Sequence, residues 1–286
     1  MVSPDQLRPF RLQLTVDGVD LDIAGMHRPG TGTPLVFLHG FGSTKEDYAD
    51  VVRRPDRGGR PVLAYDAPGC GATTCSDLSA VSIPFQAAVA ADVLRAHDVH
   101  RCHLLGHSMG GLTALLLAER GPAEVLSFTD IEGNLAPEDC FLSRQIVNHP
   151  HADPGSFLTE FAARVWGSAE SSAALVASSL AAKVRPEAVR PIFESMVDLS
   201  DHGGLLQRFL ALPVPRMFMY GEQNRRLSYL PRLAAEGVEL AEISGSGHWP
   251  MYANAPEMWS RIAEFVGRAA AATDTDASID MERRAS

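Results

Sequence analysis

The stretch Gly106-His107-Ser108-Met109-Gly110-Gly111 has the pattern G-x-S-x-G and decides the fold. The apolar run 102–105 before it is typical of a buried strand, and residues 112–120 after it are typical of a helix that ends at Gly121-Pro122. A serine at such a strand-to-helix turn needs strained backbone angles, and the flanking glycines remove side chains that would clash there. The alternative is a tight glycine turn with an incidental serine. The context favours a reactive hydroxyl beside a helix N-terminus.

Strands and helices alternate on both sides of this turn. Alternating apolar residues over 11–24, around Asp17-Gly18, predict a hairpin. Further apolar runs, typical of strands that are covered on both faces, lie at 34–39, 61–65, 125–131, 214–220 and 238–243. Helical patterns between and after them lie at 85–96, 112–120 and 258–266. The sequence therefore predicts the α/β class, with a mostly parallel, twisted sheet of about eight strands flanked by helices.

Residues 135–211 interrupt the alternation, because they contain helical patterns and no convincing strand. We interpret this stretch as a helical insertion that rests over one end of the sheet as a cap. The core is then formed by residues 1–134 and 212–272. The tail, residues 273–286, is short and polar, and we expect it to be disordered.

Composition excludes several classes of protein. The 286 residues include 25 Lys+Arg and 35 Asp+Glu, and the net charge of −10 argues against a nucleic-acid partner. The chain has neither a signal-peptide pattern nor an apolar run of roughly 18 residues, so a cytoplasmic protein without a membrane span is expected. Four scattered cysteines without a CxxC pair support neither a disulfide scaffold nor a zinc site. The oligomeric state stays open, with a homodimer as one option.

Two further motifs lie directly after predicted strands. His39-Gly40-Phe41-Gly42 follows the first, and Asp66-Ala67-Pro68-Gly69-Cys70-Gly71 follows the second. Together with the serine turn, they resemble the α/β-hydrolase superfamily over about residues 10–270. The resemblance implies that the backbone N–H groups of Phe41 and Met109 bind a developing oxyanion, and such donors contribute about 10²–10³ each in turnover. It also places Gly40 next to the substrate.

The resemblance implies a histidine near the C-terminus, because the family's chain order is nucleophile, acid, histidine. Gly245-Ser246-Gly247-His248-Trp249-Pro250 follows the last apolar run and fits this place. His248 can take the serine proton and return it to the leaving group. Four other histidines are expected to be structural or solvated rather than metal ligands, namely His103, His107, His149 and His151.

The acid departs from the family's commonest pattern, in which an Asp follows the strand 214–220. Here that stretch reads Gly221-Glu222-Gln223-Asn224, and an Asn cannot carry the negative charge that stabilises an imidazolium. In a triad, Asp→Asn costs about 10⁴ in turnover. Glu132, directly after the strand 125–131, is similar to the acid of haloalkane dehalogenases and some lactone-hydrolysing relatives. Glu222 is the reserve, and Asp130, a carboxylate of the insertion or no acid at all stay open.

The resemblance implies a serine hydrolase that cleaves a carboxylic ester or lactone of a small to medium, uncharged and fairly apolar substrate. Ser108 is the expected nucleophile and forms an acyl-enzyme, His248 is the base, and Glu132 orients His248. Trp249 and Trp166 are expected to contact the substrate, and neither a metal nor an organic cofactor is required. The alternatives are a carbon–carbon bond hydrolase or perhydrolase with the same triad, an acyltransferase, and a non-catalytic ligand receptor on this fold.

Overall fold

The computed structural model of the chain describes residues 7–54, 59–148, 153–168 and 171–285, with the backbone alone for 141–142, 154, 171 and 273–285. His149 and His151 lie outside the described residues. Within the described part, no helix is long and apolar enough to cross a membrane.

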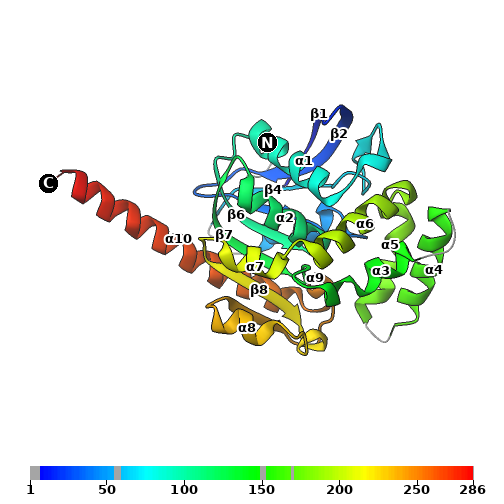
Figure 1. Ribbon diagram of the computed structural model, residues 1–286. Coiled ribbons are helices and arrows are strands. Elements are labelled where there is room, and N and C mark those ends of the chain that lie inside the picture. Colours follow the sequence, from blue (N-terminus) through cyan, green and yellow to red (C-terminus); the bar gives the residue numbers. More distant parts are fainter. Residues whose placement is uncertain (1–6, 55–58, 149–152, 169–170, 286) are drawn as a thin grey trace.

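The described residues form one sheet of nine strands in the order β1-β2-β4-β3-β6-β7-β8-β9, with β5 paired to β2 (Figure 1). They are β1 (Arg8–Val16), β2 (Val19–Arg28), β3 (Leu35–Leu38), β4 (Val62–Tyr65), β5 (Thr74–Cys75), β6 (Arg101–His107), β7 (Glu124–Ile131), β8 (Arg216–Gly221) and β9 (Glu239–Ile243). Strands β1 and β2 are antiparallel around the Asp17-Gly18 turn. The neighbours along the path β4-β3-β6-β7-β8-β9 are parallel. The predicted fold class is confirmed.

Strands β3 and β4 are apolar throughout because both faces of the sheet are buried at these strands. Along β3, Leu35 and Phe37 pack in one hydrophobic cluster, whereas Val36 and Leu38 pack in the other. Helices α1 (Ile83–Ala96), α2 (Met109–Arg120) and α8 (Leu230–Ala235) contribute to the cluster of Val36. The 3-10 helix η1 (Lys45–Arg53), α9 (Pro250–Ala253) and α10 (Ala255–Ala285) contribute to the other. This two-layer cover leaves the ends of the parallel strands as the place for a site.

The described residues of the segment 135–211 are mostly helical and form no strand. Their elements are η4 (Pro137–Cys140), α3 (Phe141–Val147), α4 (Pro154–Trp166), α5 (Ser171–Lys183), α6 (Pro186–His202) and α7 (Leu205–Ala211). Helices α3 to α6 stand together on one side of the molecule (Figure 1). An isolated antiparallel bridge between Cys70 and Val184 and a hydrogen bond from Ile83 N–H to Ser195 Oγ (2.9 Å) connect them to the rest of the fold.

Two features differ from the sequence-based expectations. Helix α10 runs to Ala285, so the backbone of residues 273–285, expected to be disordered, continues the helix and projects away from the sheet (Figure 1). The alanine run 269–272 has high intrinsic helix propensity and carries the helix into this tail. Strand β5 has only two residues, of which Thr74 is exposed, and it gave no apolar signal.

Candidate active site

Ser108 lies at the turn between β6 and α2, and its backbone is strained. Its φ of 52° and ψ of −119° are angles that a non-glycine residue rarely adopts. A Cβ on Gly106 would lie 2.4 Å from the Gly110 carbonyl oxygen, and a Cβ on Gly110 would lie 2.1 Å from the Leu38 carbonyl oxygen. Both glycines are therefore needed for the strand to turn into the helix. The Ser108 N–H donates to the Ile131 carbonyl (2.9 Å), which fixes the turn to β7.

His248 reaches Ser108 from the loop between β9 and α9. Its Nε2 lies 3.0 Å from the Ser108 Oγ, within hydrogen-bond distance. The loop is held by His107, whose Nε2–H donates to the His248 carbonyl oxygen (2.8 Å). Burial lowers the pKa of His107 to about 3, so this imidazole is neutral at physiological pH and serves as a fixed donor. A Cβ on Gly221 would lie 2.3 Å from the Gly247 carbonyl oxygen, so that glycine allows the loop to approach.

Glu132 follows β7 directly and faces the other nitrogen of the same imidazole. Its Oε2 lies 3.5 Å from the His248 Nδ1. Its Oε1 accepts a hydrogen bond from the Gly221 N–H (2.6 Å), and its Oε2 accepts one from the Asn224 Nδ2 (2.8 Å). The side chain is buried, and the backbone has a φ of 52°. The Gly221 N–H and the Asn224 amide therefore fix the orientation of this carboxylate beside the imidazole.

Asn224 and Glu222, which follow β8, have separate contacts. Asn224 is the donor to Glu132 described above, so the Asn at the family's usual acid position is a partner of a carboxylate that lies one strand away. The Glu222 Oε2 accepts the Gly245 N–H (3.0 Å), and its Oε1 lies 3.6 Å from the Arg225 Nη1. The structure therefore brings Ser108, His248 and Glu132 together, and it engages the reserve candidate Glu222 in contacts of its own.

The predicted oxyanion loop, which carries Gly40 and Phe41, lies against the serine turn. A Cβ on Gly40 would lie 2.5 Å from the His107 Nδ1, so only glycine allows the loop this close to β6. The His39 Nδ1–H donates to the Gly40 carbonyl oxygen (2.8 Å), and its Nε2 accepts the Ala67 N–H (2.9 Å). Burial lowers the pKa of His39, which keeps it neutral and able to make both bonds. Phe41 and Met109 thus belong to two adjacent turns near Ser108.

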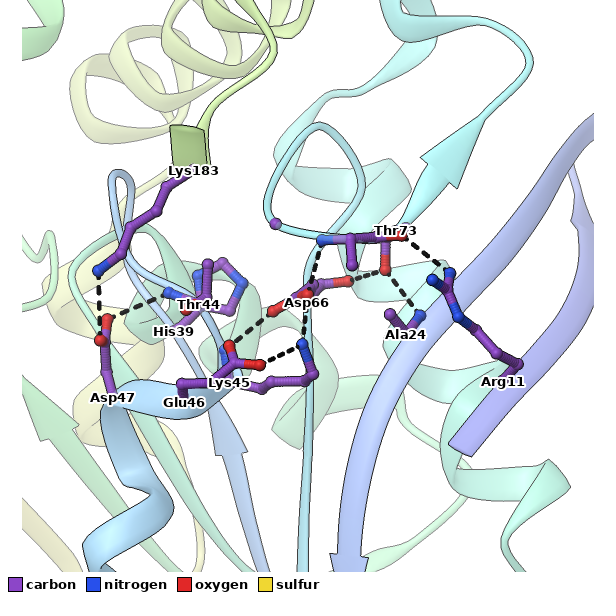
Figure 2. Close-up of polar contacts among 12 residues, drawn as sticks. Arg11, Ala24, His39, Thr44, Lys45, Glu46, Asp47, Asp66, Thr73 and Lys183 are labelled. Atoms are coloured by element: carbon purple, nitrogen blue, oxygen red, sulfur yellow. Dashed lines mark hydrogen bonds and ion pairs between the residues drawn. The ribbon is translucent and has the colours of Figure 1, made fainter. Parts of the chain in front are cut away.

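A buried carboxylate fixes the end of this loop, as Figure 2 shows. Asp66 accepts hydrogen bonds from the Lys45 N–H (2.9 Å), the Lys45 Nζ (2.8 Å) and the Ala72 N–H (2.8 Å). These bonds connect the oxyanion loop to the turn 66–71. Because the Asp66 side chain is fully buried and paired with Lys45, the loss of Lys45 would leave this carboxylate buried without its cation.

A second carboxylate joins the same loop to the helical segment 135–211 (Figure 2). Asp47 accepts the Thr44 N–H (3.1 Å), and the Lys183 Nζ, at the end of α5, lies 3.3 Å from the Asp47 Oδ1. The Lys183 Nζ also donates to the Tyr252 hydroxyl (3.0 Å). Burial alone would raise the pKa of Asp47, but hydrogen bonding to Tyr252 and the charge of Lys183 outweigh it and lower the pKa. The helical segment is thereby held next to the oxyanion loop.

Two neighbouring cavities border these residues. The serine cavity, of about 60 Å³, is lined by Ser108, His248 and Phe41, with further apolar side chains from α4 to α6 (Phe161, Val176, Phe193 and Met196). The acid-side cavity, of about 350 Å³, is lined by Glu132 and Asn224 and by residues of η4 and the loop after β8. His248, Trp249, Phe161 and Asp139 border both cavities. The arrangement can move a proton from the Ser108 hydroxyl to the His248 imidazole. It can accommodate a ligand in either of the two cavities that border His248.

The two tryptophans expected to contact substrate differ in place. Trp249 borders both cavities. Trp166 lies at the end of α4, is 62% exposed and lines neither cavity, so the structure does not support its expected role. Asp139 was missed, since nothing in its sequence context distinguishes a carboxylate that faces a cavity from one that faces solvent. Among the described residues, no group of three or more His, Cys, Asp or Glu side chains is placed to hold a metal ion.

Comparison with curated proteins finds hydrolytic enzymes that match part of the chain. It is 33% identical over 115 residues to the sn-1-specific diacylglycerol lipase of Xenopus tropicalis, covering 40% of this chain and 35% of that protein. It is 34% identical over 119 residues to the pimeloyl-[acyl-carrier protein] methyl ester esterase of Aeromonas salmonicida, covering 42% of this chain and 43% of that one. The matched stretch is thus less than half the length of each of these relatives.

Solved structures match nearly all of the chain. An N-acyl homoserine lactonase variant complexed with N-hexanoyl homoserine has a TM-score of 0.73 at 18% identity, covering 92% of this chain and 98% of that one. A thermophilic esterase from Thermogutta terrifontis has a TM-score of 0.69 at 18% identity, covering 91% and 99%. At this identity the likeness concerns the fold. A family model described as "Alpha/beta hydrolase family" matches residues 35–262, most of the sequence, and the chain belongs to this family.

Proposed function

We propose that the protein is a serine hydrolase that cleaves carboxylic esters or lactones through an acyl-enzyme. The observation that carries the proposal is the 3.0 Å separation between the His248 Nε2 and the Ser108 Oγ, with the Glu132 carboxylate at the opposite nitrogen. A hydroxyl, an imidazole and a carboxylate in this order are the parts that acyl transfer at a carbonyl carbon needs.

The first half of the reaction acylates Ser108. His248 takes the hydroxyl proton as the Ser108 Oγ attacks the carbonyl carbon, and Glu132 stabilises the imidazolium that forms. The N–H groups of Phe41 and Met109 bind the negative charge that develops on the carbonyl oxygen. When the tetrahedral intermediate collapses, His248 returns the proton to the departing alcohol oxygen. The alcohol leaves, and the acyl group stays on Ser108.

Hydrolysis of the acyl-enzyme completes the cycle with the same groups. His248 takes a proton from a water molecule that attacks the acyl carbon, and the proton then passes to the Ser108 Oγ as the acid is released. Each role is filled by a side chain or N–H group of the chain. The mechanism therefore requires no metal or organic cofactor.

Residues 135–211 act as a cap on the core of residues 1–134 and 212–272 in this proposal. The serine cavity is bounded on its core side by Phe41 and on its cap side by Phe161, Phe193 and Met196. Phe41 packs against Phe193, with ring centroids 4.6 Å apart. The small volume supports a short acyl group, and the apolar side chains on both sides of the cavity favour an uncharged one. The tie of Lys183 to Asp47 supports a closed position of the cap over Ser108.

The relatives support ester bonds as the class of target, because they include a lipase, esterases and a lactonase. A missing acid at position 224 would favour a non-catalytic receptor on this fold. The hydrogen bond from Asn224 to Glu132 gives that amide another role and removes this argument. Carbon–carbon cleavage, perhydrolysis and transfer to an acceptor alcohol use the same three side chains, and substrate profiles distinguish them from ester hydrolysis.

Covalent labelling tests the proposal directly. A fluorophosphonate probe should label the folded wild-type protein at Ser108, and peptide mass mapping identifies the labelled position. The Ser108→Ala variant should not be labelled, and hydrolysis of a p-nitrophenyl acetate substrate should disappear with it. Absence of labelling in a folded wild-type protein would contradict the proposal and favour the receptor.

A further inference from the structure

The acid-side cavity adjoins His248 and, if the proposed function holds, offers space for the leaving group of an ester. The acyl carbon is bound at Ser108, and the oxyanion points to the amides of Phe41 and Met109. The leaving oxygen must then receive its proton from the His248 Nε2, so the alcohol extends on the side of His248. His248 borders both cavities, and the acid-side cavity, at about 350 Å³, is the larger. The smaller serine cavity is left for the acyl group.

The charged groups of this cavity all have the same sign. Its lining includes the carboxylates of Glu132, Glu138 and Asp139, and none of its described lining residues is a lysine or arginine. Glu132 is engaged by His248 and Asn224. Glu138 and Asp139 belong to η4 at the base of the cap, and they contribute negative charge that the reaction itself does not use.

Hydrogen bonds hold both carboxylates in place. The Glu138 Oε1 accepts the Ser228 N–H (2.8 Å) and hydroxyl (2.9 Å). The Asp139 Oδ2 accepts the N–H groups of Leu135 and Ala136 (2.8 Å each), and its Oδ1 accepts the Tyr229 hydroxyl (3.0 Å). Because their positions are fixed before a ligand arrives, a cation would meet an organised negative potential rather than mobile side chains.

Aromatic side chains complete the lining. Trp249, Phe161 and Tyr229 border the same cavity. An aromatic wall next to carboxylates is a combination that stabilises an alkylammonium group, since the ring faces attract the cation and the alkyl groups are shielded from water. A neutral, apolar alcohol would gain from the aromatic side chains but not from the carboxylates.

We infer that the preferred substrate is an ester of a short acyl group with a larger alcohol that carries a positively charged ammonium group. The ammonium lies in the acid-side cavity between Glu138, Asp139 and Trp249. The acyl group occupies the serine cavity. This differs from the uncharged, apolar substrate that the sequence suggested, and it names the substrate class of the proposed hydrolase.

The test compares two acetate esters of nearly equal shape and different charge, acetylcholine and 3,3-dimethylbutyl acetate. Wild-type kcat/KM should be larger for the choline ester by at least about fivefold at low salt, and high salt should reduce the ratio. The assay is run at about pH 8, since burial raises the pKa of Asp139 to about 6 and its carboxyl is ionised above that pH.

Variants then show whether the carboxylates cause the preference. Glu138→Gln and Asp139→Asn should each lower the ratio of the two kcat/KM values by about two- to threefold. Leu227→Lys places a cation in the same cavity without removing a hydrogen bond of η4, so it should lower the ratio even if Asp139→Asn fails to fold. Glu124→Gln, at the far end of β7, is the matched control and should leave the ratio as in the wild type. The ratio of the two kcat/KM values in the wild type is divided by the same ratio in the variant, and this cancels the difference in intrinsic reactivity between the esters.

The outcomes separate this inference from the proposed function. Equal kcat/KM for both esters, with Ser108-dependent turnover, overturns the cationic substrate and leaves the hydrolase in place. A wild-type preference that survives both Glu138→Gln and Leu227→Lys also overturns it. Turnover of neither ester, while the fluorophosphonate still labels Ser108, rules out these alcohols in the cavity. Absence of labelling as well contradicts the proposed function itself.

Discussion

The ends of β7 and β8 lie side by side at one edge of the sheet, yet they supply opposite chemistry to the same site. The end of β7 supplies the carboxylate of Glu132. The end of β8 supplies two hydrogen-bond donors to that carboxylate, the N–H of Gly221 and the side chain of Asn224. The family's commonest pattern has its acid after the strand that corresponds to β8. In the proposed triad the acid follows β7 and its supporting donors follow β8, the reverse of that pattern.

The comparison shows what determines the place of an acid. In the proposed triad, His248 needs one carboxylate oxygen at its Nδ1, and the neighbouring parallel strands β7 and β8 both bring their carboxyl ends close to it. If both strand ends carried a carboxylate there, the two negative charges would lie within hydrogen-bond distance and repel each other. An amide at the other position keeps the hydrogen bond and removes the repulsion. Asn224 is therefore the complement of Glu132.

Removal of the charge at the end of β7 should have the largest effect. We expect Glu132→Gln to lower kcat/KM about 10³- to 10⁴-fold, because the imidazolium loses its counter-charge and the His248 tautomer is no longer fixed. Steady-state hydrolysis of a p-nitrophenyl ester measures it. Glu124→Gln makes the same substitution at the other end of β7 and should stay near wild type. A loss below tenfold in Glu132→Gln would refute the assignment of the acid.

Exchange of the two roles should restore part of the lost activity. In the double variant Glu132→Gln/Asn224→Asp the amide is on β7 and the carboxylate is after β8, so the hydrogen bond between them persists with donor and acceptor reversed. We expect kcat/KM to rise about 10- to 100-fold above Glu132→Gln alone, since position 224 is one hydrogen bond from the carboxylate that contacts His248. The double-mutant cycle measures the coupling. Without recovery, the two strand ends are not interchangeable.

Loss of the supporting donor should have a smaller effect than loss of the acid. We expect Asn224→Ala to lower kcat/KM by less than about tenfold, because the Gly221 N–H still fixes the Glu132 Oε1 and water from the adjacent cavity can replace the amide. The pH dependence of kcat/KM should shift as well, whereas a purely structural defect would lower the folded fraction alone. A loss equal to that of Glu132→Gln would make Asn224 as important as the acid.

The fold was predictable where both faces of a strand are buried. The run 35–38 is apolar at every position because β3 is covered on both sides, and such runs stand out in the sequence. Strand β5 escaped detection, since two residues that pair with one edge of β2 leave no periodic signal. Ser108 and His248 were predicted from glycine-containing motifs because close backbone approach and a positive φ leave few alternatives.

The remaining parts of the site depend on contacts between distant residues. Asn224 and Glu132 are 92 positions apart. The sequence shows that position 224 lacks a charge, but it does not show that the Asn224 amide donates to Glu132. Trp166 and Trp249 looked alike as apolar candidates, yet Trp249 borders both the serine cavity and the acid-side cavity and Trp166 borders neither. Apolar character predicts that a side chain avoids water. Which cavity or neighbour it meets is decided by how the segment 135–211 packs on the sheet.

The smallest effect should come from the other acidic residue after β8. Glu222 accepts the Gly245 N–H and lies near Arg225, and a glutamine keeps the acceptor for Gly245 while losing only a partly exposed ion pair. Such pairs are worth about 0–1 kcal/mol, so we expect Glu222→Gln to change kcat/KM by less than about threefold. A comparison of the kcat/KM values of Glu222→Gln and Glu132→Gln shows which of the two carboxylates His248 uses. A loss of two orders of magnitude in Glu222→Gln, with little loss in Glu132→Gln, would move the acid to the end of β8 and reverse the comparison.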